Sequence, residues 1–91
     1  MKKIKRVRYY FYILLCKDKT LYSGIARELA KRERVHNTGK GSKYVRAHGG
    51  GKIIYTEKFW SKSKALKREA AVKKLSKLQK LELVKTLAQK G

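Results

Sequence analysis

Hydrophobic residues occupy every position from 9 to 16, where the chain reads Tyr-Tyr-Phe-Tyr-Ile-Leu-Leu-Cys. A strand that is apolar on both faces is typical of the middle of a sheet that is covered on two sides. After the polar turn 17–19, residues 20–25 predict a second short strand that ends near Gly24. The short connection favours an antiparallel hairpin.

The rest of the chain has the pattern of helices around one more strand. The acidic residue at position 28 and the basic residues that follow suit the first turn and the later turns of a helix. Ser61 or Ser63 can cap a later helix, and Ser76 and Gln79 form a capping box for the last one. The predicted helices span 28–36, 43–48, 63–75 and 77–88, and the predicted strand spans 52–59.

This order, β-β-α-(α)-β-α-α, predicts the α+β class, with a small three-stranded, mostly antiparallel sheet flanked by helices. A chain of 91 residues suits one domain and leaves little room for large insertions. We place that domain at 9–88, behind a basic N-terminal extension at 1–8.

Charge is the strongest signal in the composition. Lys and Arg number 26 against 6 Asp and Glu, which gives a net charge of +20. Such a surface favours a polyanionic partner, and DNA or RNA is a better candidate than an anionic membrane. No apolar run approaches the ~18–20 residues that span a bilayer. The single Cys16 indicates no disulfide-linked partner and a reducing, cytoplasmic setting, with its thiol packed as a small hydrophobic group.

Glu69 lies inside an apolar arc of its predicted helix. At ~100° per residue, the arc also holds Ala65, Leu66, Ala70 and Val72. Burying a carboxylate is costly unless a cation or a donor meets it. Lys73, one turn on, is one such partner, and a hard divalent cation is another. The residue pattern alone favours the ion pair with Lys73.

Four polar residues face the predicted sheet or lie in it. Arg32 and His36 are four positions apart and share a helix face with Leu29. An arginine there can hold a phosphate with its planar fork, and a histidine can hold a proton near neutral pH. Taken alone, this face is better explained as a solvated basic surface, and Tyr12 and Tyr22 are better explained as packing residues.

A basic, glycine-containing loop follows the first helix. Gly39 and Gly41 on either side of a lysine leave backbone N–H groups accessible to a phosphate. An aromatic residue and an arginine extend this loop, which is typical of nucleic-acid surfaces. The predicted nucleic-acid-binding residues are Lys40, Lys43, Tyr44 and Arg46.

Together these residues resemble the GIY-YIG endonuclease superfamily. Their order along the chain is Tyr12, Tyr22-Ser23-Gly24, Arg32, His36, Gly-Lys-Gly and Glu69. The resemblance covers residues 9–84 and is most similar to a small single-domain bacterial branch, which is in turn similar to the nuclease domain of Slx-type structure-specific endonucleases. The stretches 32–44 and 65–69 are the most specific to that branch.

The resemblance implies a role for each residue. Tyr12 would help to deprotonate an attacking water, and Arg32 and Tyr22 would hold the phosphate and the nucleophile. His36 would be the helix histidine of the same site. Glu69 would bind one Mg²⁺ or Mn²⁺, which would stabilise the leaving oxygen and the scissile phosphate.

The motifs also depart from the family pattern. Tyr10 and Phe11 replace the name-giving glycine and isoleucine of the first motif. Ser23 replaces the isoleucine of the second motif, beside Gly24, to which we assign a structural role. Some family members carry an asparagine after the metal glutamate, whereas the only asparagine here is Asn37.

The resemblance favours a metal-dependent endonuclease that hydrolyses phosphodiester bonds in DNA, in repair or processing. Two alternatives are a non-catalytic DNA- or RNA-binding module with the same fold and a basic RNA-associated structural protein. The nuclease hypothesis requires that the five candidate residues converge. It also requires an odd hairpin loop or a β-bulge, because a two-residue loop would point Tyr12 and Tyr22 to opposite faces.

Overall fold

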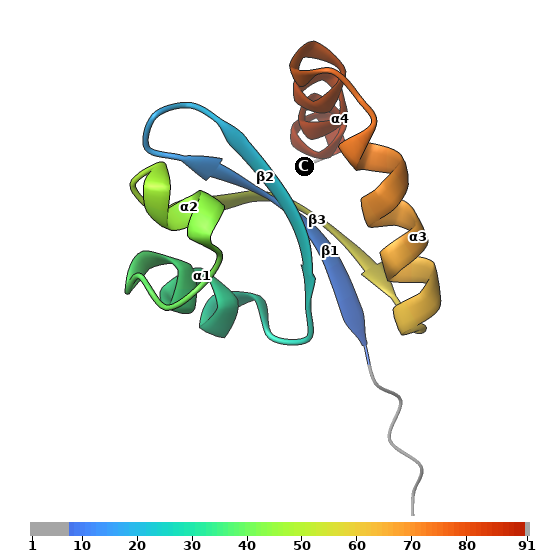
Figure 1. The fold of residues 1–91 in the computed structure, drawn as a ribbon. Helices are drawn as coiled ribbons and strands as arrows, with labels where there is room; N and C mark the ends of the chain where they lie inside the picture. The colour runs from blue at the N-terminus through green and yellow to red at the C-terminus, as the bar shows by residue number, and fades with distance from the viewer. Residues whose placement is uncertain (1–7, 91) are drawn as a thin grey trace, which may run out of the picture.

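The computed structural model describes the backbone of residues 8–90 and the side chains of residues 8–86. The strands β1 (Tyr9–Cys16), β2 (Leu21–Ala26) and β3 (Gly51–Phe59) form one antiparallel sheet in the order β2-β1-β3 (Figure 1). The helices are α1 (Leu29–Asn37), α2 (Lys43–Ala47), α3 (Lys62–Lys73) and α4 (Lys77–Lys90). The predicted α+β class and element order are confirmed.

The turn between β1 and β2 places the two tyrosines on one face of the sheet. Its loop, 17–19, has three residues, and Lys19 adopts a φ of 74°. A left-handed residue at the end of such a loop is common in hairpins. Tyr12 lies opposite Gly24, and Tyr22, two positions before that glycine, points to the same side. The odd loop that joint function requires is therefore present.

Helices cover both faces of the sheet, as the apolar run of β1 predicts. Figure 1 shows α1 and α2 on one side of the sheet and α3 and α4 on the other. The first core cluster joins β1 to α2 and includes Tyr12, Leu14, Cys16 and Val45. The second joins β1 to α3 and includes Phe11, Ile13, Tyr55 and Val72. Cys16 is a buried core residue, as expected.

β2 is an edge strand, and Figure 1 shows it running between the two helical layers. Gly24 in this strand makes room for the ring of Tyr12. A Cβ atom at position 24 would lie 2.6 Å from the Tyr12 hydroxyl and 2.8 Å from its Cζ. The structural role expected for Gly24 therefore has a steric basis.

Several helix ends differ from the prediction by one or two residues, and two of them have a clear physical reason. Glu28 was expected in the first turn of α1, but its backbone is extended, with φ −128° and ψ 105°, so the helix begins at Leu29 and has no acidic residue in its first turn. The end of α3 falls at Lys73 rather than near 75. Bonds from the N–H groups of Lys74 and Leu75 to carbonyls three residues earlier tighten the chain there.

The predicted caps of the last two helices are present. The Ser61 hydroxyl accepts a hydrogen bond from the Lys64 N–H at 3.4 Å. Ser76 and Gln79 form the reciprocal capping box, since the Ser76 N–H donates to the Gln79 side chain at 2.9 Å and the Gln79 N–H donates to the Ser76 hydroxyl at 3.1 Å.

The basic N-terminal extension predicted at 1–8 lies outside the described residues except for Arg8. Within the described residues, no helix combines the length and the apolar character that crossing a bilayer requires.

Replacing Gly24 with alanine should lower the free energy of unfolding by about 1–3 kcal/mol, because the added methyl group overlaps the Tyr12 ring. Urea unfolding measures the loss. In a Tyr12→Leu background the same substitution should cost less, because the shorter side chain removes the overlapped atoms. If Gly24→Ala lowered the free energy of unfolding equally in both backgrounds, the Tyr12 ring would not be what the added methyl group overlaps.

Candidate active site

The centre of the site is a hydrogen bond between two buried side chains. The Tyr12 hydroxyl, on β1, lies 2.9 Å from His36 Nε2, on α1. Tyr12 is 1% exposed and His36 is 2% exposed. A Cβ atom at Gly41 would lie 2.6 Å from His36 Nδ1, so that glycine lets the loop pass over the imidazole. The interpretation of this helix face as a solvated surface is wrong for His36, because α1 packs onto the sheet through Leu29.

An aromatic row runs from this hydrogen bond to the surface. The ring of Tyr22 lies 6.4 Å from that of Tyr12 and 5.4 Å from that of His36, centroid to centroid. Tyr44 follows at 5.7 Å from Tyr22, and His48 at 4.3 Å from Tyr44. Tyr44 is 42% exposed. The row therefore connects the buried phenol to a position that a ligand can touch.

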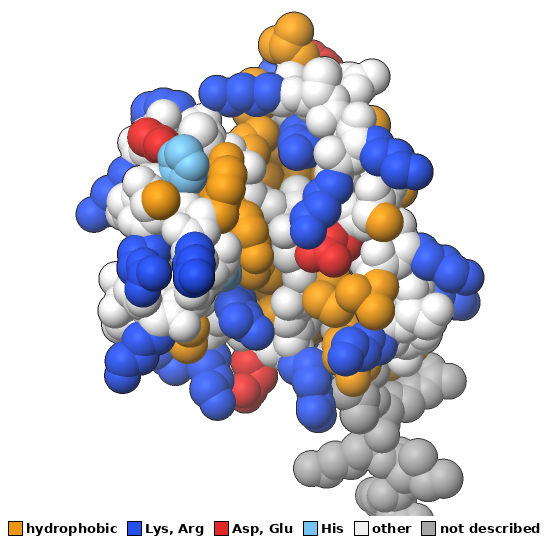
Figure 2. Space-filling view, viewed as in Figure 1, with side chains coloured by type: hydrophobic (Ala, Val, Ile, Leu, Met, Phe, Trp, Pro, Cys, Tyr) orange, Lys and Arg blue, Asp and Glu red, His pale blue; other side chains and the backbone are white. Residues whose placement is uncertain are grey.

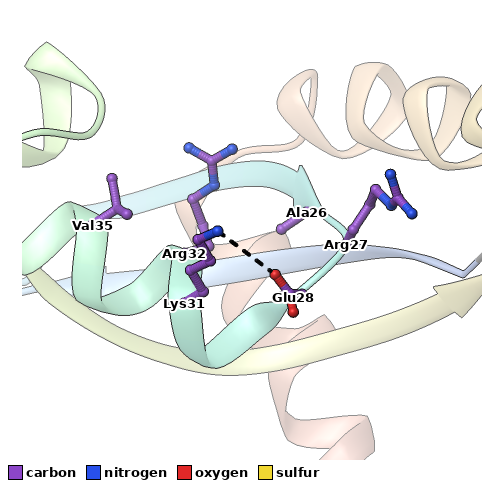
Figure 3. Close-up of a pocket in the computed structure, with 6 residues that line it drawn as sticks. All are labelled: Ala26, Arg27, Glu28, Lys31, Arg32 and Val35. Atoms are coloured by element: carbon purple, nitrogen blue, oxygen red, sulfur yellow. Dashed lines mark ion pairs between the residues drawn. The ribbon is translucent and has the colours of Figure 1, made fainter.

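Arg32, one turn before His36, is exposed. It lies near Ala26, at the end of β2, whereas Tyr22 lies near the start of that strand. It borders a hollow of about 280 Å³ lined by Ala26, Arg27, Glu28, Lys31, Arg32 and Val35 (Figure 3). Its guanidinium points away from the Lys31–Glu28 ion pair, whose atoms are 3.9 Å apart, and so is free of that carboxylate. It also lines a neighbouring hollow of about 310 Å³ that reaches Lys62.

The surroundings shift the pKa values of both buried groups. Burial raises the pKa of the Tyr12 phenol above its usual range, and the nearby Tyr22 and Glu69 raise it further, while the charge of Arg32 opposes them. Burial lowers the pKa of His36, and Arg32 lowers it further. His36 is therefore neutral near pH 7, and a neutral imidazole has one nitrogen that can accept a proton.

Glu69 approaches the site from the other helical layer. Its side chain is 19% exposed and pairs with Lys73 at 3.5 Å, so the ion pair favoured by the residue pattern is present. Its helix, α3, packs on the opposite face of the sheet from Tyr12 but also along the edge strand β2. The carboxylate lies close enough to raise the pKa of Tyr12. The predicted convergence of the five candidate residues on one surface is therefore wrong for Glu69, which comes from the helix on the opposite face of the sheet from Tyr12. Its carboxylate is within electrostatic range of Tyr12, and its helix also contacts the edge strand β2.

Figure 2 shows this edge from outside. A band of hydrophobic side chains runs down the middle of the face, and Lys and Arg side chains lie on both sides of it. The predicted nucleic-acid-binding residues Lys40, Lys43, Tyr44 and Arg46 are all exposed, in α2 and the loop before it. Arg46 also donates a hydrogen bond to the Gly39 carbonyl at 3.4 Å, which holds the loop against α2.

Asn37 has a structural role that the sequence analysis missed. Its side-chain amide donates to the Gly51 carbonyl at 2.8 Å and accepts from the Gly51 N–H at 3.0 Å, which ties the end of α1 to β3. Glu33, one turn earlier, accepts from the Ile53 N–H at 2.7 Å. The sequence contains one sign of this contact, the run of glycines after position 48. A side chain at Gly50 would collide with the Asn37 amide.

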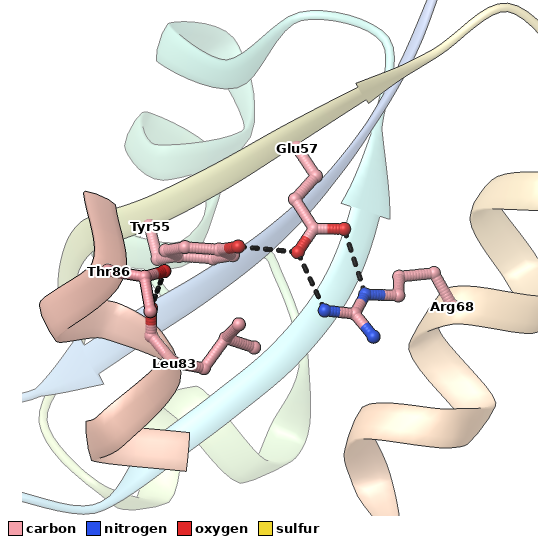
Figure 4. A network of polar contacts seen from close by, with 5 residues as sticks. All are labelled: Tyr55, Glu57, Arg68, Leu83 and Thr86. Atoms are coloured by element: carbon pink, nitrogen blue, oxygen red, sulfur yellow. Dashed lines mark hydrogen bonds and ion pairs between the residues drawn. The ribbon is translucent and has the colours of Figure 1, made fainter. Parts of the chain in front are cut away.

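A second missed group fixes the helix that carries Glu69. Arg68 on α3 holds Glu57 on β3 with two hydrogen bonds, of 2.8 and 2.9 Å, and Tyr55 donates to the same carboxylate (Figure 4). Burial alone would raise the pKa of Glu57, but the bonds from Arg68 and Tyr55 hold it below its usual range. This pair anchors α3 one residue before Glu69.

The fold is that of a known family of catalytic domains. The model of the GIY-YIG catalytic domain matches residues 8–82, and the chain belongs to this family. Its relatives include a UPF0213 protein of Oceanobacillus iheyensis, 42% identical over 85% of this chain and 90% of the relative. A UPF0213 protein of Clostridium perfringens is 48% identical over 82% of this chain and 81% of the relative.

Two structures determined by solution NMR share the fold. The E. faecalis protein EF2693 is 42% identical, with a TM-score of 0.61 over 98% of this chain and 93% of that one. The UPF0213 protein BH0048 of Bacillus halodurans is 39% identical, with a TM-score of 0.56 over 87% of this chain and 84% of that one. The resemblance inferred from the motifs is thereby confirmed.

His36 should make stability depend on pH in a defined direction. Its pKa is lower in the folded protein than its unfolded value of ~6.5, so the unfolded chain binds more protons in mild acid. Stability should therefore fall as the pH drops below about 6.5. A His36→Gln variant should lack this part of the loss when melting temperatures are compared between about pH 7.5 and 5. His48→Gln, which keeps His36, should retain it. Parallel curves for His36→Gln and wild type would contradict the assignment.

Glu57→Gln should lower the free energy of unfolding by about 1–3 kcal/mol, because it replaces the charged acceptor of Arg68 with a neutral one. Glu82→Gln is the matched control: its pair with Lys85 spans 3.6 Å between side chains that are 74% and 67% exposed. That substitution should change stability by no more than about 0.5 kcal/mol. Equal effects in urea unfolding would mean that the Glu57 pair does not anchor α3.

Proposed function

We propose that this protein is a divalent-metal-dependent endonuclease that hydrolyses phosphodiester bonds in DNA, in repair or processing in the cytoplasm. The observation that carries the proposal is the buried hydrogen bond between Tyr12 and His36, with the charges of Arg32 and Glu69 acting on the phenol. Perturbed, coupled groups of this kind gather at functional sites. Membership of the GIY-YIG catalytic domain family supports the same class of activity.

The chemistry of Glu69 fits a hard cation with few protein ligands. Within the described residues, no three His, Cys, Asp or Glu side chains come together as a metal cluster. Mg²⁺ commonly takes one or two carboxylates and fills its other positions with water and substrate phosphate, so one carboxylate beside a basic groove is sufficient. Lys73 must leave Glu69 for a cation to bind there. When bound, Mg²⁺ or Mn²⁺ would stabilise the charge on the scissile phosphate and the leaving oxygen.

The protein's own residues supply the remaining steps of the proposed mechanism. Tyr12 would orient the attacking water and take its proton, while its own phenolic proton passes to Nε2 of neutral His36. Burial, Tyr22 and Glu69 disfavour the phenolate that this transfer creates, and the positive charge of Arg32 offsets part of that effect. Arg32 and Tyr22 would hold the scissile phosphate.

Four exposed residues would position the DNA. Lys40, Lys43 and Arg46 would contact its phosphates, and Tyr44 would contact a base. Gly24 would contribute indirectly, because its lack of a side chain leaves room for the Tyr12 ring.

A non-catalytic DNA- or RNA-binding module is the second candidate, and one observation favours it. Glu69 already has a partner, because Lys73 lies at 3.5 Å. In that case Glu69 would serve stability, and the net charge of +20 would serve binding alone.

Glu69→Gln separates the two candidates. The variant and the wild type are incubated with linear, flapped and branched DNAs, with and without Mn²⁺. If Glu69 holds the metal, cleavage should fall on the order of 100-fold or more while DNA binding persists, because the shape is kept and the charge is lost. Glu82→Gln, on the exposed face of α4, should cut like the wild type.

The opposite outcomes are equally specific. A stable Glu69→Gln variant that cuts as fast as the wild type would refute metal ligation by Glu69. A destabilised variant, together with no cleavage by the wild type under any divalent metal, would favour the binding module.

A further inference from the structure

Two adjoining hollows open where β2 begins, away from the Arg32 end of the strand. They have volumes of about 320 and 230 Å³ and share Leu21, Tyr44 and Lys80 in their linings. The larger also takes in Tyr22, Ser23 and Lys73. The two helical layers therefore meet here across the sheet edge, with α2 on one side and α3 and α4 on the other.

Tyr44 gives this hollow an aromatic wall. It is the exposed end of the row that begins at Tyr12, and the rings of Tyr22 and His48 support it at 5.7 and 4.3 Å. A ring held in place by its neighbours loses little freedom when a base stacks on it. Base–aromatic stacking is also tolerant of sequence, since every base has a π face.

Lys73 and Lys80 give the hollow a cationic wall. Lys80 forms no ion pair with any described carboxylate, so its charge is available to a ligand. Lys73 is more than half exposed and pairs with Glu69 at 3.5 Å, a loose pair that a phosphate can compete for. These two lysines come from different helices and face the tyrosine across the hollow.

Ser23 is a buried polar residue beside this hollow. Its side chain is buried, it lines the larger hollow, and its hydroxyl makes no hydrogen bond to any described residue. A buried hydroxyl without a partner is unfavourable, and most such groups in proteins bond to another protein group or to an ordered water. The Ser23 hydroxyl has almost no accessible surface, so a ligand in the hollow would not touch it directly.

We propose that this hollow is a subsite for one unpaired nucleotide of the DNA strand, next to the scissile phosphate. The base would stack on Tyr44, and the phosphate would lie between Lys73 and Lys80. The assignment rests on the proposed nuclease function. The nucleotide must be unpaired, because a base in duplex DNA is already stacked and must leave the helix to meet a side-chain ring.

The test is DNA binding in EDTA, where cleavage plays no part. Fluorescence anisotropy compares a labelled single-stranded oligo-dT with a duplex of equal length. Tyr44→Leu should weaken single-strand binding by about 5- to 100-fold and change duplex binding much less, while Tyr44→Phe keeps the wild-type affinity. Lys73→Gln and Lys80→Gln should each reduce the slope of log affinity against log salt by about 0.7. Lys67→Gln, an exposed lysine of α3 outside this lining, is the matched control and should change the slope less.

These results test the subsite proposal independently of the proposed nuclease activity. Wild-type single-strand affinity in Tyr44→Leu, or an equal loss for the duplex, would overturn the subsite even if the protein cuts DNA. A selective loss in Tyr44→Leu would support the subsite even if the wild type cuts no DNA, and the nuclease proposal alone would then fall. If circular dichroism shows that Tyr44→Leu is unfolded, the two lysine variants decide, and slopes equal to that of Lys67→Gln would overturn the subsite.

Discussion

The hydrogen bond between Tyr12 and His36 is the interaction on which the rest of this structure depends. A phenol on a central strand must find a partner if it is buried, because an unpaired hydroxyl in the core is costly. The imidazole that meets it comes from α1, 24 positions along the chain, so this single bond sets how α1 lies on the sheet. Arg32 and the aromatic row take their positions from that placement. Two glycines, Gly24 and Gly41, supply the space that the two rings need.

The helical layers are attached to the sheet through its far edge. Asn37 holds the first layer to Gly51, and Arg68 holds the second layer to Glu57, and both attachments end on β3. The hollows open on the β2 side, between the two helical layers. Two of the polar contacts that hold the helical layers therefore end at the β3 edge, the Tyr12–His36 bond holds α1 to the central strand, and the candidate site residues lie toward the β2 edge.

Local features were predictable from the sequence, and pairings between distant residues were not. The burial of β1 follows from its unbroken apolar run, the capping box of Ser76 and Gln79 from three-residue spacing, and the pair of Glu69 with Lys73 from four-residue spacing. The burial of His36 could not be read from its helix, which carries four charged residues in a row at 31–34. It depends on a partner in another element, as do the attachments of Asn37 and Arg68, and each half of such a pair looks like an ordinary surface residue. Hydrophobic periodicity carries no information about which distant residues meet. The family resemblance does, because its motifs relate positions that are far apart in the chain.

The position of β2 at the edge of the sheet has a further consequence for how copies of this chain behave together. An edge strand presents unpaired N–H and C=O groups, and in many proteins these groups recruit a strand from a second molecule and start aggregation. Here the edge lies between two helical layers whose rims carry Lys and Arg. A second copy, also with a net charge of +20, is repelled from that opening, whereas an anionic chain is drawn into it. The same charge distribution therefore acts as a filter that admits a polyanion to the open edge and keeps the protein's own strands out.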